Sequence, residues 1–150
     1  MNLHFFTSGY LNQDMANNIA KVEMANAFVN NKLIKNVYLY FVYSSNKDLK
    51  DLKSKLASNI RLRGLKFSLS EKTFANHTPN RVVRMIRKKY VLFSHLRRFI
   101  ASKFSNKDII FIRGEQSLFA CYIAKKIKYI NYSCEIHNYE LGKKQLKDFF

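Results

Sequence analysis

The stretch that decides the fold is NVYLYFVY, residues 36–43, which is apolar throughout and rich in β-branched and aromatic side chains. Such a run is typical of a central strand in a parallel sheet, because helices cover both faces of that sheet and leave no solvent side for polar residues. Shorter apolar runs predict further strands at residues 3–6 (LHFF), 108–112 (DIIFI) and 132–137 (YSCEIH). The first of these is expected to end at a turn, Thr7-Ser8-Gly9-Tyr10.

The segments between these runs have helical periodicity. Residues 15–31 predict a helix in which Asp14 caps the first turn. Its predicted buried face consists of Ala16, Ile19, Ala20, Glu23 and Ala27. Further helices are predicted over residues 46–57, 81–104 and 115–127 and from residue 140 onward, and a strand over residues 60–69. Alternating strands and helices with long crossovers predict a single α/β domain over residues 1–150, a Rossmann-like three-layer sandwich with a mostly parallel sheet. The last helix has no strand after it, so this domain is expected to be incomplete at its carboxyl end.

The predicted helix over residues 81–104 carries an apolar and a basic side. The apolar side, expected to face the core, consists of Val82, Ile86, Phe93, Leu96 and Ile100. The basic side, expected to face outward, consists of Arg81, Arg84, Arg87, Lys88, His95 and Arg98. Three interpretations stay open for the basic side: a solvated helix face, a surface that docks on anionic lipid head groups, or a nucleic-acid contact.

The formal charge of +17 on 150 residues attracts polyanions of any kind, although a Lys-rich and Asn-rich coding bias would produce the same excess. A hydrophobic fraction of 47% excludes a disordered chain. Cys121 and Cys134 are too few for a disulfide framework and lack the spacing of metal ligands. The sequence shows no signal peptide and no run long enough to span a bilayer, so we expect a cytoplasmic protein that can also be peripheral on the inner face of the membrane.

Polar residues follow several of the predicted strands, at the sheet edge where α/β proteins bind their ligands. They are Ser8 and Gly9 after the first strand, Arg113 after the fourth, and Glu135, His137 and Asn138 at the fifth. Gly9 either allows a tight turn or lets a sugar or phosphate approach the backbone. Arg113 either anchors an anionic ligand or forms a salt bridge with Glu115 or Glu135. His137 is either structural or a proton-transfer group. A single glycine excludes the dinucleotide fingerprint, and no P-loop is present.

The run DIIFIRGEQSLFACYIAKKIKYINYSCEIHN, residues 108–138, resembles the amino-terminal domain of family 4 glycosyltransferases, which have the GT-B fold. The resemblance rests on a strand that ends in Arg113, a helix, and a strand that carries Glu135 and His137. The opening of the chain is also similar, with Gly9 in the first loop and Lys21 and Glu23 on the first helix, although many members have a second glycine in that loop.

The resemblance implies that a sugar is transferred from a nucleotide-sugar donor to a cell-surface glycan or lipid-linked acceptor, without a metal. It implies that His137 lies near the transferred sugar and that Gly9 faces the cleft between the two domains. Donor contacts would come from a second domain, on a separate chain if the gene is split, so the 150 residues alone are expected to be inactive. The alternatives are a basic nucleic-acid-binding module, which lacks any known nucleic-acid-binding motif, and a defective remnant.

Overall fold

The protein is described by a computed structural model, which covers residues 1–150 except 12–15, 70–79, 129, 131 and 135–150 and the side chains of residues 17 and 134. Within that part of the chain the strands form one parallel sheet in the order β3-β2-β1-β4-β5. The strands are β1 (Asn2–Tyr10), β2 (Asn36–Tyr43), β3 (Ile60–Lys66), β4 (Ile109–Arg113) and β5 (Tyr132–Cys134). The helices are α1 (Ala16–Val29), α2 (Asn46–Lys55), α3 (Arg81–Ala101) and α4 (Glu115–Ile127).

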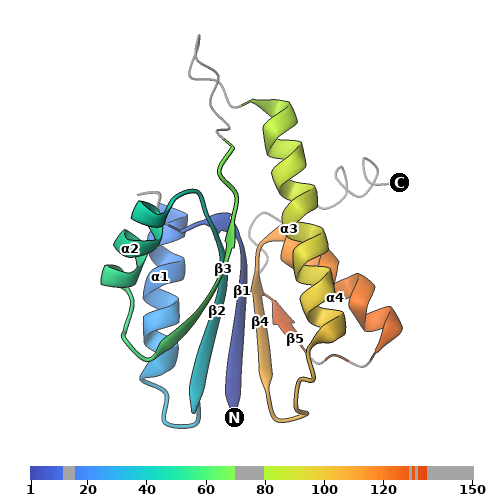
Figure 1. Ribbon diagram of the computed structural model, residues 1–150. Helices are drawn as coiled ribbons and strands as arrows, with labels where there is room; N and C mark the ends of the chain where they lie inside the picture. Colours follow the sequence, from blue (N-terminus) through green and yellow to red (C-terminus); the bar gives the residue numbers. More distant parts are fainter. Residues whose placement is uncertain (12–15, 70–79, 129, 131, 135–150) are drawn as a thin grey trace.

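The helices cover the two faces of the sheet in pairs. Figure 1 shows α1 and α2 on one side and α3 and α4 on the other, with the amino end of β1 at the bottom of the view. All strands therefore point upward in this view, and their carboxyl ends lie at the top. The predicted Rossmann-like three-layer α/β sandwich is confirmed.

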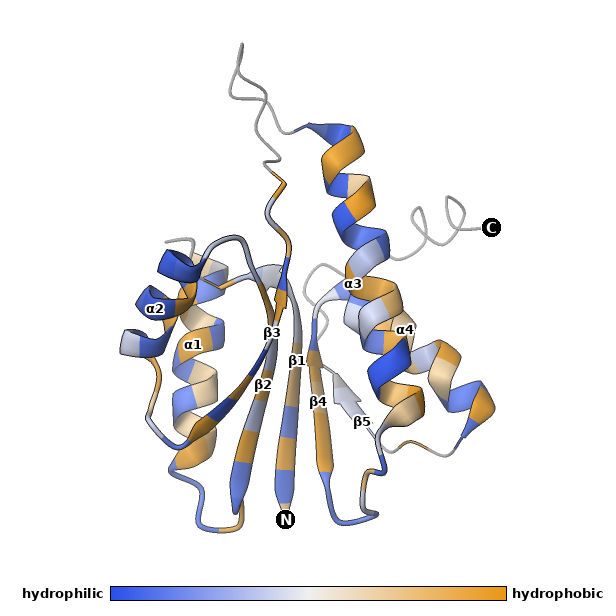
Figure 2. Ribbon diagram, in the orientation of Figure 1, coloured by the Kyte–Doolittle hydropathy of each residue, from blue (hydrophilic) through white to orange (hydrophobic). Residues whose placement is uncertain are grey.

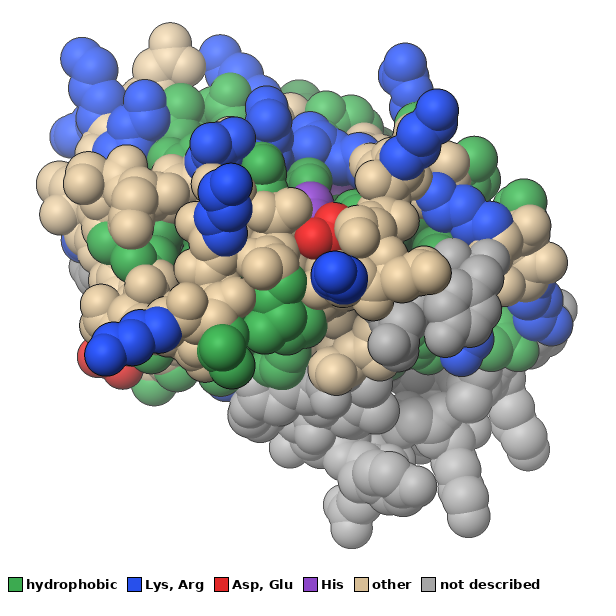
Figure 3. Space-filling view, turned by 90° about the horizontal axis from the view of Figure 1, so that it is seen from below, with side chains coloured by type: hydrophobic (Ala, Val, Ile, Leu, Met, Phe, Trp, Pro, Cys, Tyr) green, Lys and Arg blue, Asp and Glu red, His purple; other side chains and the backbone are tan. Residues whose placement is uncertain are grey.

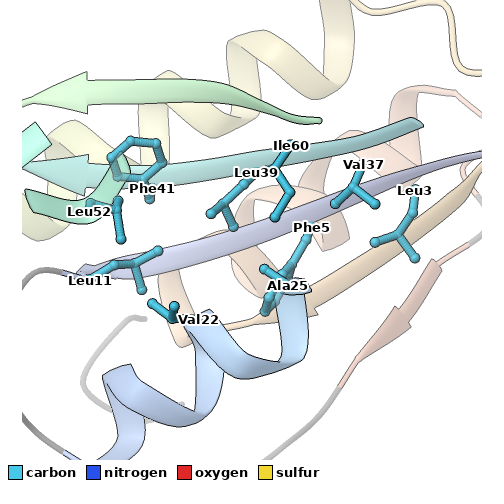
Figure 4. Close-up of a cluster of buried hydrophobic side chains, with 10 residues drawn as sticks. All are labelled: Leu3, Phe5, Leu11, Val22, Ala25, Val37, Leu39, Phe41, Leu52 and Ile60. Carbon is cyan, nitrogen blue, oxygen red and sulfur yellow. The ribbon is translucent and has the colours of Figure 1, made fainter. Parts of the chain in front are cut away.

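The core on the α1–α2 side is built from alternate residues of the central strands. Leu3 and Phe5 of β1 lie beside Val37, Leu39 and Phe41 of β2, and all of them are buried. Figure 4 shows these side chains pointing toward α1 and α2, where Val22, Ala25 and Leu52 complete the cluster. The short helix α2 has the predicted apolar spacing, and the reciprocal hydrogen bonds of Ser45 and Asp48 cap its first turn.

The core on the α3–α4 side is built around stacked aromatic rings. The rings of Phe6 and Tyr40 stack at 3.9 Å between centroids, and Phe99 of α3 lies 4.3 Å from Phe6. Cys121 of α4 is buried in the same cluster. Residues 109–112 of β4 pack on both faces of the sheet and are therefore all apolar, as Figure 2 shows.

The predicted buried face of α1 is wrong. Ile19, Ala16, Glu23 and Ala27 are exposed, whereas Asn18, Lys21, Val22 and Ala25 face the sheet. The error arose because two polar residues, Asn18 and Lys21, occupy the buried face at the end of the helix that lies nearest the carboxyl edge of the sheet. An amphipathic pattern cannot identify a face that is half polar.

The predicted faces of α3 are right only in part: Leu96 packs against the core and Arg81 and Arg84 are exposed, as predicted. Val82, Ile86 and Phe93 are exposed, whereas Val91 and Phe99 are fully buried. The face predicted to be basic and outward therefore turns toward the sheet over the second half of the helix, where the imidazole of His95 is buried and donates to or accepts from the hydroxyl of Ser117 at 2.9 Å. These polar groups pack against aromatic side chains of the sheet: Phe6 contacts His95 edge-on, and the guanidinium of Arg98 lies over Tyr40.

Candidate functional site

The sheet has its topological switch point between the carboxyl ends of β1 and β4, and we refer to this position as the β1–β4 crevice. The chain moves from β1 outward through β2 to β3 and then returns across the sheet to β4 on the other side of β1. The connections after β1 and β4 therefore leave toward opposite faces, and such a switch point is where open α/β sheets bind ligands. Thr7 of β1 is aligned with Arg113 of β4, so the predicted residues Ser8, Gly9 and Arg113 do meet at this edge.

The predicted turn after the first strand does not form. Strand β1 continues through Tyr10, and its register against β2 shifts between Phe6 and Tyr10. The apolar run ends at Phe6, which explains the prediction, but the backbone stays extended and bulges instead of turning. Gly9 therefore lies in this bulge with an ordinary backbone conformation, since the structure shows a positive φ only for Gly114 among its described glycines.

Gly114 is the glycine that the site requires. Its φ is +148°, and a β-carbon added there would lie 2.1 Å from the hydroxyl oxygen of Ser8 and 2.9 Å from its backbone nitrogen. A side chain is excluded by both the backbone conformation and the lack of space. Gly114 thus allows the loop after β4 to pack directly on the bulge of β1, and α4 begins at the next residue.

Lys21 is the functional candidate that the sequence analysis did not select. The residue is 7% exposed, and its ammonium donates a long hydrogen bond of 3.4 Å to the side-chain oxygen of Asn18. A β-carbon on Gly9 would lie 3.6 Å from that ammonium, so the lysine reaches the bulge of β1. The signal that could have found it is helical spacing, because Lys21 lies one turn before Ala25 and two turns before Phe28, which both pack in the core.

Two buried cations, Lys21 and Arg113, lie close enough to interact in the site. Burial lowers the pKa of Lys21, and the positive charge of Arg113, itself 7% exposed, lowers it further. Among the described residues, no carboxylate pairs with Lys21. A lysine buried beside an arginine is costly, and an anion between the two would offset the cost.

Helix α3 closes the crevice from the other face. Arg87 donates a hydrogen bond of 2.9 Å to the backbone carbonyl of Ser8, and its guanidinium lies 5.2 Å from the ring centre of Tyr10. Glu115, at the start of α4, lies 4.0 Å from Lys88 of α3. Arg87 thus connects α3 to the bulge of β1, and Lys88 connects α3 to the start of α4.

The basic residues predicted to form one outward surface are divided by the structure. Arg81 and Arg84 are exposed, whereas Arg87, Lys88 and Arg98 are half-buried against the sheet and α4. His95 does not belong to this surface, because burial lowers its pKa to about 3 and it stays neutral.

Several predicted residues lie outside the described part of the chain: Asp14, Glu135, His137, Asn138 and the helix from residue 140 onward. Within the described ranges, no three His, Cys, Asp or Glu side chains come together as a metal site would require. No described helix is both long enough and apolar enough to cross a membrane.

Comparison of the chain with protein-family models, with curated proteins and with solved structures gave no match. The resemblance to family 4 glycosyltransferases therefore stays a hypothesis.

Proposed function

We propose that the chain is the acceptor-side domain of a glycosyltransferase and that the β1–β4 crevice binds the anionic part of a phosphate-bearing acceptor. One observation carries the proposal: two buried cations, Lys21 and Arg113, flank the bulge of β1 at the switch point of the sheet. A phosphate accepts charge-assisted hydrogen bonds from both cations, and these are stronger than the bonds that the uncharged hydroxyls of a sugar accept.

The sequence resemblance supplies the reaction class in this proposal. It assigns acceptor binding to the amino-terminal domain and donor contacts to a second domain, so Ser8, Gly9 and Arg113 would hold the acceptor. Glu135 and Asn138 would contact sugar hydroxyls, and His137 would lie near the transferred sugar. The nucleotide-sugar is a substrate in this scheme, and no cofactor is needed.

The binding test uses glucose 1-phosphate as the probe and glucose as the uncharged control, with titration calorimetry on the 150-residue chain. We expect glucose 1-phosphate to bind, glucose to show no measurable heat, and Lys21→Met to weaken the affinity at least tenfold. Lys50→Met is the matched control, because Lys50 is exposed on α2 and the variant has the same net charge. Equal losses of affinity in the two variants would show that only the overall charge matters and would refute the proposed site.

The catalytic assignment needs a transferase with both domains. There, His137→Ala should lower the rate of sugar transfer while donor affinity stays unchanged. An unchanged rate would remove His137 from the reaction.

The charge of the chain supports a second candidate, a nucleic-acid-binding module, since the sequence has 27 Lys and Arg residues and only 10 Asp and Glu residues. Binding to a random-sequence duplex should then weaken steeply as salt increases. Lys21→Met separates the candidates, because it should abolish sugar-phosphate binding and leave duplex binding within twofold. Absent or salt-insensitive duplex binding would eliminate the second candidate.

A further inference from the structure

Three arginines gather around two tyrosines on the outer part of the sheet, on the face that α3 covers only in part. The guanidinium groups of Arg61 and Arg63 lie 5.4 and 5.8 Å from the ring centre of Tyr38, and that of Arg98 lies 5.2 Å from the ring centre of Tyr40. Arg61 also donates a hydrogen bond of 3.2 Å to the hydroxyl of Tyr38. We refer to these five residues as the Arg–Tyr cluster.

The pairing of the strands explains why the cluster is open to solvent. Two rows of aligned residues cross the sheet from β4 to β3: Ile110, His4, Tyr38 and Arg61 form one, and Ile112, Phe6, Tyr40 and Arg63 form the other. Each row begins with a buried isoleucine under α3 and α4 and ends with an exposed arginine on the edge strand. The five residues of the cluster belong to β2, β3 and α3, whereas the crevice lies at the carboxyl ends of β1 and β4.

The tyrosine rings hold the cluster in a fixed arrangement. The ring of His4 stacks on Tyr38 at 4.8 Å between centroids with an interplanar angle of 5°, and its Nδ1 lies 3.1 Å from the hydroxyl of Tyr40. These contacts with His4 hold both tyrosine rings in place. An arginine stacked on a ring that is held in place loses less conformational entropy when it binds a ligand. Since the rings already carry guanidinium groups, they do not offer a free platform for stacking nucleic-acid bases.

The positive charge of the cluster is not neutralised within the described part of the chain. No described Asp or Glu forms a salt bridge with Arg61, Arg63 or Arg98. Figure 3, which views the amino ends of the strands, shows Lys and Arg side chains along its upper edge and acidic atoms only near the centre and at the lower left. Burial lowers the pKa of Arg98, and the charge of Arg63 also lowers it, whereas Tyr40 raises it. The positive charges of Arg63 and Arg98 therefore repel each other.

We propose that the Arg–Tyr cluster is a second anion site, separate from the crevice, that binds a phosphate group through Arg61, Arg63 and Arg98. A carboxylate offers two oxygens in one plane and suits one guanidinium fork, whereas the oxygens of a phosphate point in several directions and can accept from more than one guanidinium group. The phosphate can belong to a soluble ligand or to a lipid head group, and the chemistry of recognition is the same.

The test follows the side-chain Nε–H signals of arginine by NMR while inorganic pyrophosphate is added to the ¹⁵N-labelled 150-residue chain. Saturable shifts are expected for Arg61, Arg63 and Arg98, with at least tenfold weaker binding in the double variant Arg61→Gln/Arg63→Gln. The control is Lys50→Gln/Lys53→Gln, which removes the same charge from exposed positions of α2 and should change the affinity by less than threefold. Equal losses in the two double variants, or shifts that do not saturate, would overturn the proposal.

A second measurement identifies the source of the phosphate, and a third distinguishes this site from the crevice. If sedimentation with phosphatidylglycerol vesicles is lost in the arginine double variant, the ligand is a lipid head group; if it persists while pyrophosphate binding is lost, the ligand is soluble. Lys21→Met should leave the pyrophosphate shifts unchanged, so failure of the crevice and failure of this cluster give different results.

Discussion

Replacement of Gly114 by alanine tests whether the loop after β4 is locked against the bulge of β1. The backbone has φ of +148°, a region that only glycine occupies readily, and this strain costs about 1–3 kcal/mol for alanine. The new β-carbon would also lie 2.1 Å from the Ser8 hydroxyl oxygen, and relief of such overpacking costs about 1–3 kcal/mol. The expected total, about 4 kcal/mol, is a large part of the stability of a typical domain.

The assay is urea unfolding followed by far-UV circular dichroism, with a thermal scan in parallel. For a domain of this size the loss corresponds to a fall in Tm of roughly 8–16 °C. Gly9→Ala is the control, since a β-carbon there meets its nearest neighbours at 3.6 and 3.9 Å, and the change should stay within about 0.5 kcal/mol. Similar unfolding midpoints for the two alanine variants would refute the close packing of Ser8 and Gly114.

Three further predictions concern buried groups and the face of α3. Lys21→Met should raise the free energy of unfolding by about 1 kcal/mol in urea titrations, because it removes a buried cation, even as it weakens anion binding; a fall would show that the lysine is structural. The pKa of His95 is about 3 when folded and 6.5 when unfolded, so only the unfolded chain gains a proton as the pH falls below 6.5. Stability should therefore drop by about 2 kcal/mol from pH 6.5 to 5, and urea titrations of His95→Gln should lack that drop. Phe93→Ala should change the unfolding free energy by less than about 0.5 kcal/mol, whereas Phe99→Ala should cost about 3–5 kcal/mol; the reverse order would restore the predicted faces of α3.

The sequence by itself determined the class of fold. Apolar strands such as 36–43, separated by helical segments and long crossovers, allow few arrangements other than a parallel sheet between two helical layers. It also brought Ser8 and Arg113 to the same edge, because the carboxyl ends of parallel strands meet there.

Only the tertiary structure decided which sides of α1 and α3 face the sheet. Periodicity identifies a buried face by its lack of polar groups, and it fails where such groups are buried for a reason, as Lys21 is at the crevice and His95 is beside Phe6 and Ser117. The importance of Gly114 over Gly9 was likewise invisible in the sequence, because both are single glycines after apolar strands. What separates them is the distance to Ser8, a residue more than a hundred positions away from Gly114, and that distance exists only once β1 and β4 are paired.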